Sequence, residues 1–328
     1  MSFPEIKYCP GTLAEGFDTY SRACLKRVFQ SKKVNHVLSY DSPASNPDDD
    51  DLFLENRKRI SISGVQAKCS VLLEKNKLRL VKEGERGTYI LKPIPGAGKK
   101  SDQMPANEHL TMQIARQAYG IETAENALIF FRKGAPAYIT KRFDVREDGT
   151  KWAQDDFASL AGRTPQTHGE NYKYAGNYWE LFQLMQKFVP AYRLESPKLL
   201  RLLIFNYLFS NGDAHYKNFS LLETPMGDYR LSPAYDLLNS RIHINDNDFA
   251  LDDCLLPRNL AQGNIRHQFS MLAELAGIDK RTFKDSLSFM LSRSGWVEKL
   301  TFSSFLNETT KRNYWQLYQG RLKQLMKE

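Results

Sequence analysis

The stretch "NGDAHYKN", residues 211–218, directly follows the apolar run "LLRLLIFNYLFS" at 199–210. That run has the i, i+3, i+4 spacing of a buried helix, so several polar side chains gather where the helix ends. Asp213 and Asn218 lie five positions apart, and Asp236 follows two further apolar segments. A carboxylate beside an acceptor hydroxyl, with an amide oxygen and a second carboxylate that hold Mg²⁺, is the arrangement of a phosphoryl-transfer site.

An ordinary turn is the alternative, since Asp and Asn are common in tight turns where they hydrogen-bond the backbone. Asp-x4-Asn alone is therefore weak support for catalysis. The oxygen donors suit Mg²⁺, whereas His215 by itself is a poor reason to expect zinc. The four cysteines are scattered without a C-x-x-C pair, which argues against a zinc site and a disulfide framework.

Support for the site comes from Lys92, a charged residue within the otherwise apolar "YILKP". A strand lysine that reaches nucleotide phosphates, held by a glutamate on the neighbouring helix, is used in phosphoryl transfer. Glu108 is the candidate glutamate. Taken singly, a solvent-facing Lys92 and a Glu108 that favours a helix start are the simpler explanations. Because Lys92 and Glu108 are followed along the chain by Asp213, Asn218 and Asp236, a phosphoryl-transfer site is favoured over these simpler explanations.

A phosphate-binding loop is expected at "SISGVQAK", residues 61–68. Gly64 permits close backbone approach, and Ser63, nearby N–H groups and Lys68 can meet phosphate oxygens. The segment matches neither G-x-G-x-x-G nor G-x-x-x-x-G-K-[ST]. An ordinary turn therefore remains open as the alternative.

The composition is that of a folded globular protein, with 41% hydrophobic and 26% charged residues among 328. The net charge of +8 favours an acidic partner, a nucleotide or a nucleic-acid-associated complex. The basic residues are spread along the chain, so a dedicated DNA-binding stripe is weakly supported. Neither a signal peptide nor an apolar window of roughly 18 residues is present, and we expect a cytoplasmic protein without membrane association.

Periodicity separates a strand-rich first half from a helical second half. The first half contains a predicted helix at 18–30, a solvated loop at 41–51, a hairpin at 69–81 and strands at 87–94 and 135–145. Between the strands a helix at 107–120 is capped by Asn107 and ended by Gly120. Beyond 155, helices are predicted at 177–189, 197–209, 264–277, 284–294 and 304–328, with one inserted hairpin at 219–236.

Taken together, these motifs resemble the HipA family of bacterial serine/threonine kinase toxins. The resemblance runs from "SISGVQAK" through "YILKP", "NEHL", "TKRFDV", "QDDF" and "NGDAHYKNFS" to "LSPAYD". "GDAHYKN" alone also resembles the catalytic loop of lipid kinases. The family implies an α+β, two-lobed protein-kinase-like fold, with a small strand-rich N-terminal lobe at 1–145 and a larger mainly helical C-terminal lobe at 146–328. Mg²⁺-ATP would bind between them.

The resemblance also implies roles for individual residues. Asp213 would be the catalytic base, and Asn218 and Asp236 the Mg²⁺ ligands. "KRF" at 141–143 would be the hinge that meets adenine, with Asp144 near the ribose. The implied ATP-binding residues are Ser63, Gly64, Val65, Gln66, Ala67, Lys68, Lys92, Glu108, Lys141, Arg142, Phe143, Asp144, His215, Tyr216, Lys217 and Tyr235.

About sixty residues precede the glycine-containing loop, fewer than in HipA itself. The chain is therefore more similar to the short HipT-type members, in which a separate small protein supplies the missing portion. In relatives, a serine at the position of Ser61 is autophosphorylated, and we expect modification of Ser61, Ser63 or both. Two charges added beside the ATP phosphates would repel nucleotide.

Relatives phosphorylate an aminoacyl-tRNA synthetase and so arrest translation and growth. They are neutralised by a small helix-turn-helix antitoxin of the HipB type, so any DNA contact here would be indirect. The short N-terminal region suggests tryptophanyl-tRNA synthetase as the target. We therefore expect an ATP- and Mg²⁺-dependent serine/threonine kinase toxin. The alternatives are a non-catalytic kinase-fold binding protein and a small-molecule or lipid kinase.

Overall fold

The computed structural model describes residues 6–42, 68–146 and 148–327, which divide into two compact units. Unit 1 comprises the described residues of Met1–Gln113, Ala124–Thr150 and Lys299–Lys311, and unit 2 those of Ile114–Thr123, Lys151–Glu298 and Arg312–Glu328. The predicted division at residue 145 had placed 114–123 with the first lobe and 299–311 with the second. The chain therefore crosses between the units more than once.

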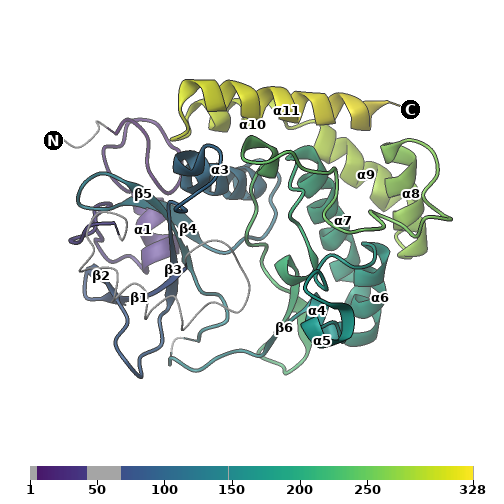
Figure 1. The fold of residues 1–328 in the computed structure, drawn as a ribbon, viewed down its shortest axis with the longest axis horizontal. Coiled ribbons are helices and arrows are strands. Elements are labelled where there is room, and N and C mark those ends of the chain that lie inside the picture. The colour runs from purple at the N-terminus through teal and green to yellow at the C-terminus, as the bar shows by residue number, and fades with distance from the viewer. Residues whose placement is uncertain (1–5, 43–67, 147, 328) are drawn as a thin grey trace. The chain divides into compact units, whose positions relative to one another are not determined.

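A five-stranded antiparallel sheet forms the centre of unit 1 (Figure 1). Its strands, in the order β2-β1-β3-β5-β4, are β2 (Lys77–Leu80), β1 (Cys69–Glu74), β3 (Tyr89–Pro93), β5 (Pro136–Lys141) and β4 (Asn126–Phe130). The predicted hairpin is confirmed, since β1 and β2 pair with Glu74 opposite Lys77. The strands predicted at 87–94 and 135–145 are confirmed as β3 and β5, which pair directly. β4 was not predicted.

Helix α1 (Arg22–Phe29) packs against this sheet. The side chain of Ser21 caps it by accepting a hydrogen bond from the Cys24 N–H. Val28 and Phe29 are fully buried with Leu91 and Ile139 in the core of unit 1. Burying each such side chain stabilises the fold by about 1.5–3 kcal/mol. The core therefore fixes the sheet that carries Lys92.

Helix α3 (Met104–Gln117) follows the short helix η3 (Ser101–Gln103) and begins before its predicted start. The predicted cap at Asn107 is wrong, because Asn107 lies inside the helix and is fully buried. Gly120, the predicted stop, has a φ of 61° just beyond the helix. That left-handed conformation favours glycine.

The remaining helices are mostly in unit 2. They are α4 (Phe157–Leu160), α5 (Pro165–His168), α6 (Trp179–Phe188), α7 (Tyr192–Leu208), α8 (Ile265–Leu275), α9 (Lys280–Leu291), α10 (Ser294–Phe302) and α11 (Glu308–Met326). α7 is buried on most sides and contacts α6, α9 and strand β8 (Tyr229–Leu231). α7 begins at Tyr192, before the predicted start at 197, and α10 was not predicted. In the described ranges, no helix is long and apolar enough to cross a membrane.

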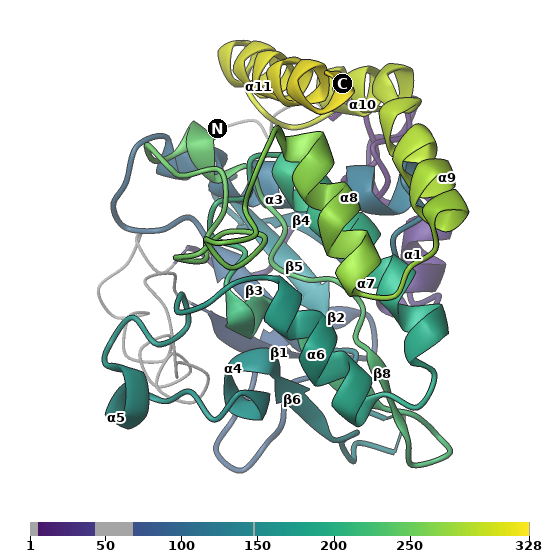
Figure 2. The ribbon, with the colours of Figure 1, turned by 90° about the vertical axis from the view of Figure 1, so that its right-hand side faces the viewer.

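A three-stranded antiparallel sheet completes unit 2. Its order is β6 (Gln154–Asp156), β7 (Ser220–Glu223) and β8 (Tyr229–Leu231), followed by the short helix η5 (Ser240–Ile242). The predicted hairpin at 219–236 is confirmed by the pairing of β7 with β8. β6 was not predicted; α4 follows it directly and contacts both β6 and α6 (Figure 2). The loop 211–218 thus lies between buried α7 and this sheet.

Candidate active site

Lys92 and Glu108 form a buried ion pair in unit 1. Lys92 lies on β3 and Glu108 on α3, and Nζ of the lysine is 2.6 Å from Oε1 of the glutamate. The side chains are 4% and 3% exposed, and the ammonium also lies 5.4 Å from the centre of the Tyr138 ring. The explanation that Lys92 faces solvent is therefore wrong. This arrangement of strand lysine and helix glutamate is the one kinases use for ATP phosphates.

The tripeptide "KRF" begins at Lys141, the last residue of β5, and its backbone is hydrogen-bonded within unit 1. The N–H groups of Lys141 and Arg142 donate to backbone carbonyl oxygens at 2.7 and 2.9 Å. The guanidinium of Arg142 pairs with Asp144 through two hydrogen bonds, at 2.9 and 2.5 Å. Asp144 is buried, so this pair holds its carboxylate in place. Contacts of Phe143 and its neighbours with adenine and ribose stay a prediction.

The segment predicted to bind phosphate, residues 61–68, falls almost wholly outside the described residues. Its predicted contacts and modification sites therefore stay predictions for Ser61, Ser63, Gly64, Val65, Gln66 and Ala67. Lys68 is described, and it directly precedes β1. The solvated loop predicted at 41–51 also falls outside the described residues from residue 43 onward.

Asp213 is oriented by its neighbours in unit 2. Gly212 precedes it and donates its N–H to Oγ of Ser240 at 2.9 Å. A Cβ at Gly212 would lie 2.4 Å from the Asp246 carboxylate, so a larger residue there would have to displace that side chain. Tyr174 donates its hydroxyl to Oδ1 of Asp213 at 2.9 Å. The side chain of Asp213 is 50% exposed, so it can be reached by a substrate.

Asn218 and Asp236 are the predicted Mg²⁺ ligands. Asn218 ends the short helix η4 (Tyr216–Asn218), and its Oδ1 accepts the N–H of His215 at 3.1 Å. Asp236 has a φ of 55°, a left-handed conformation that costs a non-glycine residue of order 1 kcal/mol and is concentrated at functional sites. Amide and carboxylate oxygens suit Mg²⁺.

The described residues contain no cluster of three or more His, Cys, Asp or Glu side chains that could hold a metal by themselves. Mg²⁺ usually binds through one or two carboxylates together with phosphate oxygens, and keeps several waters. The donor set of Asn218 and Asp236 therefore fits Mg²⁺ that arrives with a nucleotide.

His215 and Lys217 differ in the charge that they can supply. Burial, and next the positive charge of Lys173, lower the pKa of His215 to about 3. The imidazole is therefore neutral at pH 7, and its Nε2, 3.9 Å from Oδ1 of Asp213, is no cation. Nζ of Lys217 lies 4.0 Å from Oδ2 of Asp156. Of the two residues, Lys217 alone can offer positive charge to a phosphate.

The two tyrosines assigned to ATP binding support the loop from inside unit 2. Tyr216 is fully buried and donates its hydroxyl to the Asn177 carbonyl and to Oε2 of Glu180, both at 2.9 Å. Tyr235 donates its hydroxyl to the carbonyl of Lys217 at 2.9 Å. Their side chains therefore position "HYKN", and their contact with nucleotide stays a prediction.

Sequence reasoning missed Tyr174 and Tyr138. Burial, followed by the charge of Asp213, raises the pKa of Tyr174, so it stays a protonated donor. Tyr174 lies in "NYKYAGNY" at 171–178, where no periodic pattern marks its role. Tyr138 is directly opposite Lys92 in the β3–β5 pair. Aligning the two predicted strands residue by residue would have identified Tyr138 as the neighbour of Lys92.

Residues 60–294 match the model of the HipA-like C-terminal domain family. The chain is 29% identical over 284 residues to the Sinorhizobium fredii protein named "Putative kinase Y4dM", a match that covers 81% of this chain and 62% of that protein. It is 24% identical over 199 residues to the serine/threonine-protein kinase toxin HipA of Shewanella oneidensis, covering 56% and 44%. The chain thus spans less than two thirds of the length of either relative.

Two solved structures share the fold. The Shewanella oneidensis toxin–antitoxin complex of HipA, HipB and operator DNA matches with a TM-score of 0.61 at 19% identity, covering 80% of this chain and 63% of that chain. The Helicobacter pylori proinflammatory kinase CtkA matches with a TM-score of 0.52 at 15% identity, covering 78% and 92%. This likeness confirms the predicted α+β, protein-kinase-like fold. Because the family model matches well over half of its residues, the chain belongs to the HipA-like C-terminal domain family.

Proposed function

We propose that this protein is an ATP- and Mg²⁺-dependent serine/threonine protein kinase and the toxin of a toxin–antitoxin pair. The observation that carries the proposal is the buried ion pair of Lys92 and Glu108. A buried pair seldom stabilises a fold more than apolar residues of the same volume, so a functional reason for it is favoured. Relatives named as a kinase and as a kinase toxin support that reason.

In the proposed reaction, Lys92 contacts the ATP phosphates while Glu108 holds the lysine. Asn218 and Asp236 hold Mg²⁺, which neutralises phosphate charge when it is bound. Asp213 accepts the proton of the attacking hydroxyl as its oxygen bonds to the γ-phosphorus and the bond to ADP breaks. Its exposure and its hydrogen bond from Tyr174 suit that role. Rate acceleration comes mainly from positioning and charge neutralisation.

We propose further that the two sets of residues serve the same nucleotide. Residues 1–145 would then act as the nucleotide-binding lobe and 146–328 as the catalytic lobe. The loop at 61–68 would cover the phosphates, and autophosphorylation of Ser61 or Ser63 would repel ATP because it adds about two negative charges each. Mass spectrometry after incubation with Mg²⁺-ATP tests this. Unmodified serines in an otherwise active enzyme would remove the autophosphorylation proposal alone.

The proposed substrate is an aminoacyl-tRNA synthetase in the bacterial cytoplasm, and tryptophanyl-tRNA synthetase is the first candidate. The proposed partner is a small helix-turn-helix antitoxin of the HipB type, through which any DNA contact would be made. The structure of HipA with HipB and operator DNA supports this partner. A second small protein is also proposed as a partner, on the resemblance to HipT-type members.

Transfer to a protein can be tested in bacterial lysate depleted of nucleotides, using labelled ATP and Mg²⁺. Wild type should label one synthetase, and Asp213→Asn should label nothing. Asp285→Asn is the matched control, because Asp285 is an exposed aspartate on α9 of the same unit. The control should label the same protein as wild type.

Other outcomes separate the alternatives. Labelling of small molecules or lipids without any labelled protein would favour a small-molecule kinase. ATP binding without transfer to anything would favour a non-catalytic binding protein. Labelling that persists in Asp213→Asn would contradict the proposed base.

A further inference from the structure

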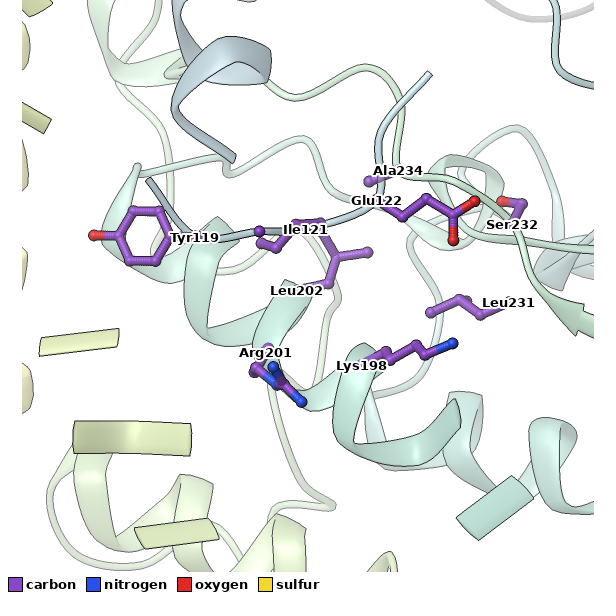
Figure 3. Close-up of a pocket in the computed structure, with 10 residues that line it drawn as sticks. Tyr119, Ile121, Glu122, Lys198, Arg201, Leu202, Leu231, Ser232 and Ala234 are labelled. Atoms are coloured by element: carbon purple, nitrogen blue, oxygen red, sulfur yellow. The ribbon is translucent and has the colours of Figure 1, made fainter. Parts of the chain in front are cut away.

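A cavity of about 300 Å³ lies within unit 2, apart from the residues assigned to phosphoryl transfer (Figure 3). Its walls are one face of α7, the segment after α3, and the end of β8 with the residues that follow. Lys198, Arg201 and Leu202 recur at i, i+3 and i+4 and so line the cavity from one helix face. The volume is at the lower end for small-molecule sites.

Most of the lining is apolar. Ile121, Leu202 and Leu231 contribute side chains, and Tyr119 contributes its ring. The Tyr119 hydroxyl points away from the other lining residues in Figure 3 and is hydrogen-bonded to the hydroxyl of Tyr318 at 3.1 Å. An apolar body is therefore what these walls would bury.

The carboxylates near the cavity already have partners. Glu122 accepts two hydrogen bonds from Arg230, at 2.8 and 3.0 Å. Glu195 is buried, and it pairs with Lys198 through Oε1 and accepts the N–H of Leu231 through Oε2. Each carboxylate therefore already has a basic side chain as its partner.

Arg201 differs from the other charged residues of the cavity. It makes no hydrogen bond or ion pair with any residue in the described ranges, and its Nε is a buried donor without a partner. Leaving a buried donor unpaired is unfavourable, and a guanidinium favours carboxylate or phosphate oxygens. The cavity thus combines apolar walls with one guanidinium whose buried Nε has no hydrogen-bond partner.

We propose that this cavity binds a small organic acid, with its carboxylate on Arg201 and its apolar body against Ile121, Leu202 and Leu231. The site is separate from the proposed nucleotide site and does not depend on kinase activity. Ala234 also lines the cavity, and its N–H donates to the Glu122 carbonyl oxygen at 2.8 Å. A bound acid would therefore also contact the segment that leads to Asp236.

The test uses 4-phenylbutyrate as the probe and the full chain as the protein. Binding is measured by titration calorimetry and by ligand-observed NMR, with 4-phenylbutanamide as the uncharged analogue and acetate as the anion without an apolar body. Wild type should bind phenylbutyrate saturably and both analogues at least about 10-fold more weakly, because a charge-assisted hydrogen bond and the apolar contact are each lost.

Arg201→Gln should weaken phenylbutyrate binding about 10-fold or more. Arg193→Gln is the matched control, because Arg193 is an exposed arginine on the same helix. Its affinity should equal that of wild type. Hydrogen exchange should show protection by the probe at 119–122 and 231–234, which tests the site even if Arg201→Gln does not fold.

Four results would overturn the proposal. The first is the absence of saturable binding by folded wild type at millimolar probe. The second is equal affinity for the acid and its amide. The third is unchanged binding by Arg201→Gln, and the fourth is protection by the probe at other segments only.

Discussion

Replacing Glu108 with leucine should destabilise unit 1 far more than unit 2. The substitution removes the carboxylate 2.6 Å from Nζ of Lys92 and leaves an ammonium with a 4% exposed side chain. Breaking a buried pair by removing one partner costs about 3–5 kcal/mol. The double variant Lys92→Met/Glu108→Leu removes both charges, so it should be more stable than the two single losses added together, by about 2 kcal/mol.

The chain offers a way to read the two units separately. All four tryptophans, Trp152, Trp179, Trp296 and Trp315, belong to unit 2. Hydrogen exchange of peptides over 89–93 and 104–113 reports the β3 and α3 segments of unit 1. A loss of 3 kcal/mol corresponds to roughly 100-fold faster exchange there when opening is at equilibrium, while the tryptophan fluorescence midpoint should change little.

Glu74→Gln is the control, since Glu74 pairs with Arg79 on the exposed edge of the same sheet. Exchange in that variant should match wild type, because exposed ion pairs contribute little. Unchanged exchange over 89–93 in Glu108→Leu would refute the importance of the buried pair. If the stability losses of Lys92→Met and Glu108→Leu simply add in the double variant, the two side chains are not coupled.

Three further substitutions test other parts of the structure. Gly87→Ala should destabilise unit 1 by about 1–3 kcal/mol in denaturant titrations, because its Cβ would lie 2.9 Å from the backbone N and O of Val71, whereas Gly96→Ala, with open space around it, should not. His109 should make stability fall as pH drops from about 6.5 toward 3, by about 1.4 kcal/mol per pH unit; burial, and next Arg27, lower its folded pKa to about 3, so the unfolded state binds the proton first. In denaturant titrations of His109→Gln, the free energy of unfolding should fall less steeply between pH 6.5 and 3 than in wild type. Near pH 8 its dependence on pH should be the same as in wild type. Tyr174→Phe should lower kcat on the order of 10-fold with little change in the KM for ATP, because it removes the hydrogen bond to Asp213; an unchanged kcat would contradict the positioning role.

The elements that sequence reasoning identified are those with strong local patterns. The hairpin of β1 and β2, the β7–β8 hairpin and helix α7 each carry an apolar repeat bounded by turn residues. Lys92 could also be identified, because a charge within an apolar strand requires a partner. Local pattern was enough for these features.

Other elements carry no such pattern. All five residues of β4 are buried, so the alternation of a half-exposed strand is absent. β6 is "QDD", three polar residues that form a strand because they pair with β7. Pro105 lies in the first turn of α3, where proline is favoured, and is the sequence signal for a helix start before Asn107. The contact of Tyr174 with Asp213 joins residues 39 positions apart, which only the tertiary fold brings together.

The most consequential proposal is that this protein binds Mg²⁺-ATP with the help of Lys92 and Asp236. Titration calorimetry of ATP into purified wild type, Lys92→Met and Asp236→Asn, with and without Mg²⁺, tests it most directly. We predict one ATP per chain for wild type, weaker binding in Lys92→Met under both conditions, and weaker binding in Asp236→Asn chiefly when Mg²⁺ is present. Wild type that binds no ATP, or wild-type affinity in either variant, would contradict the claim.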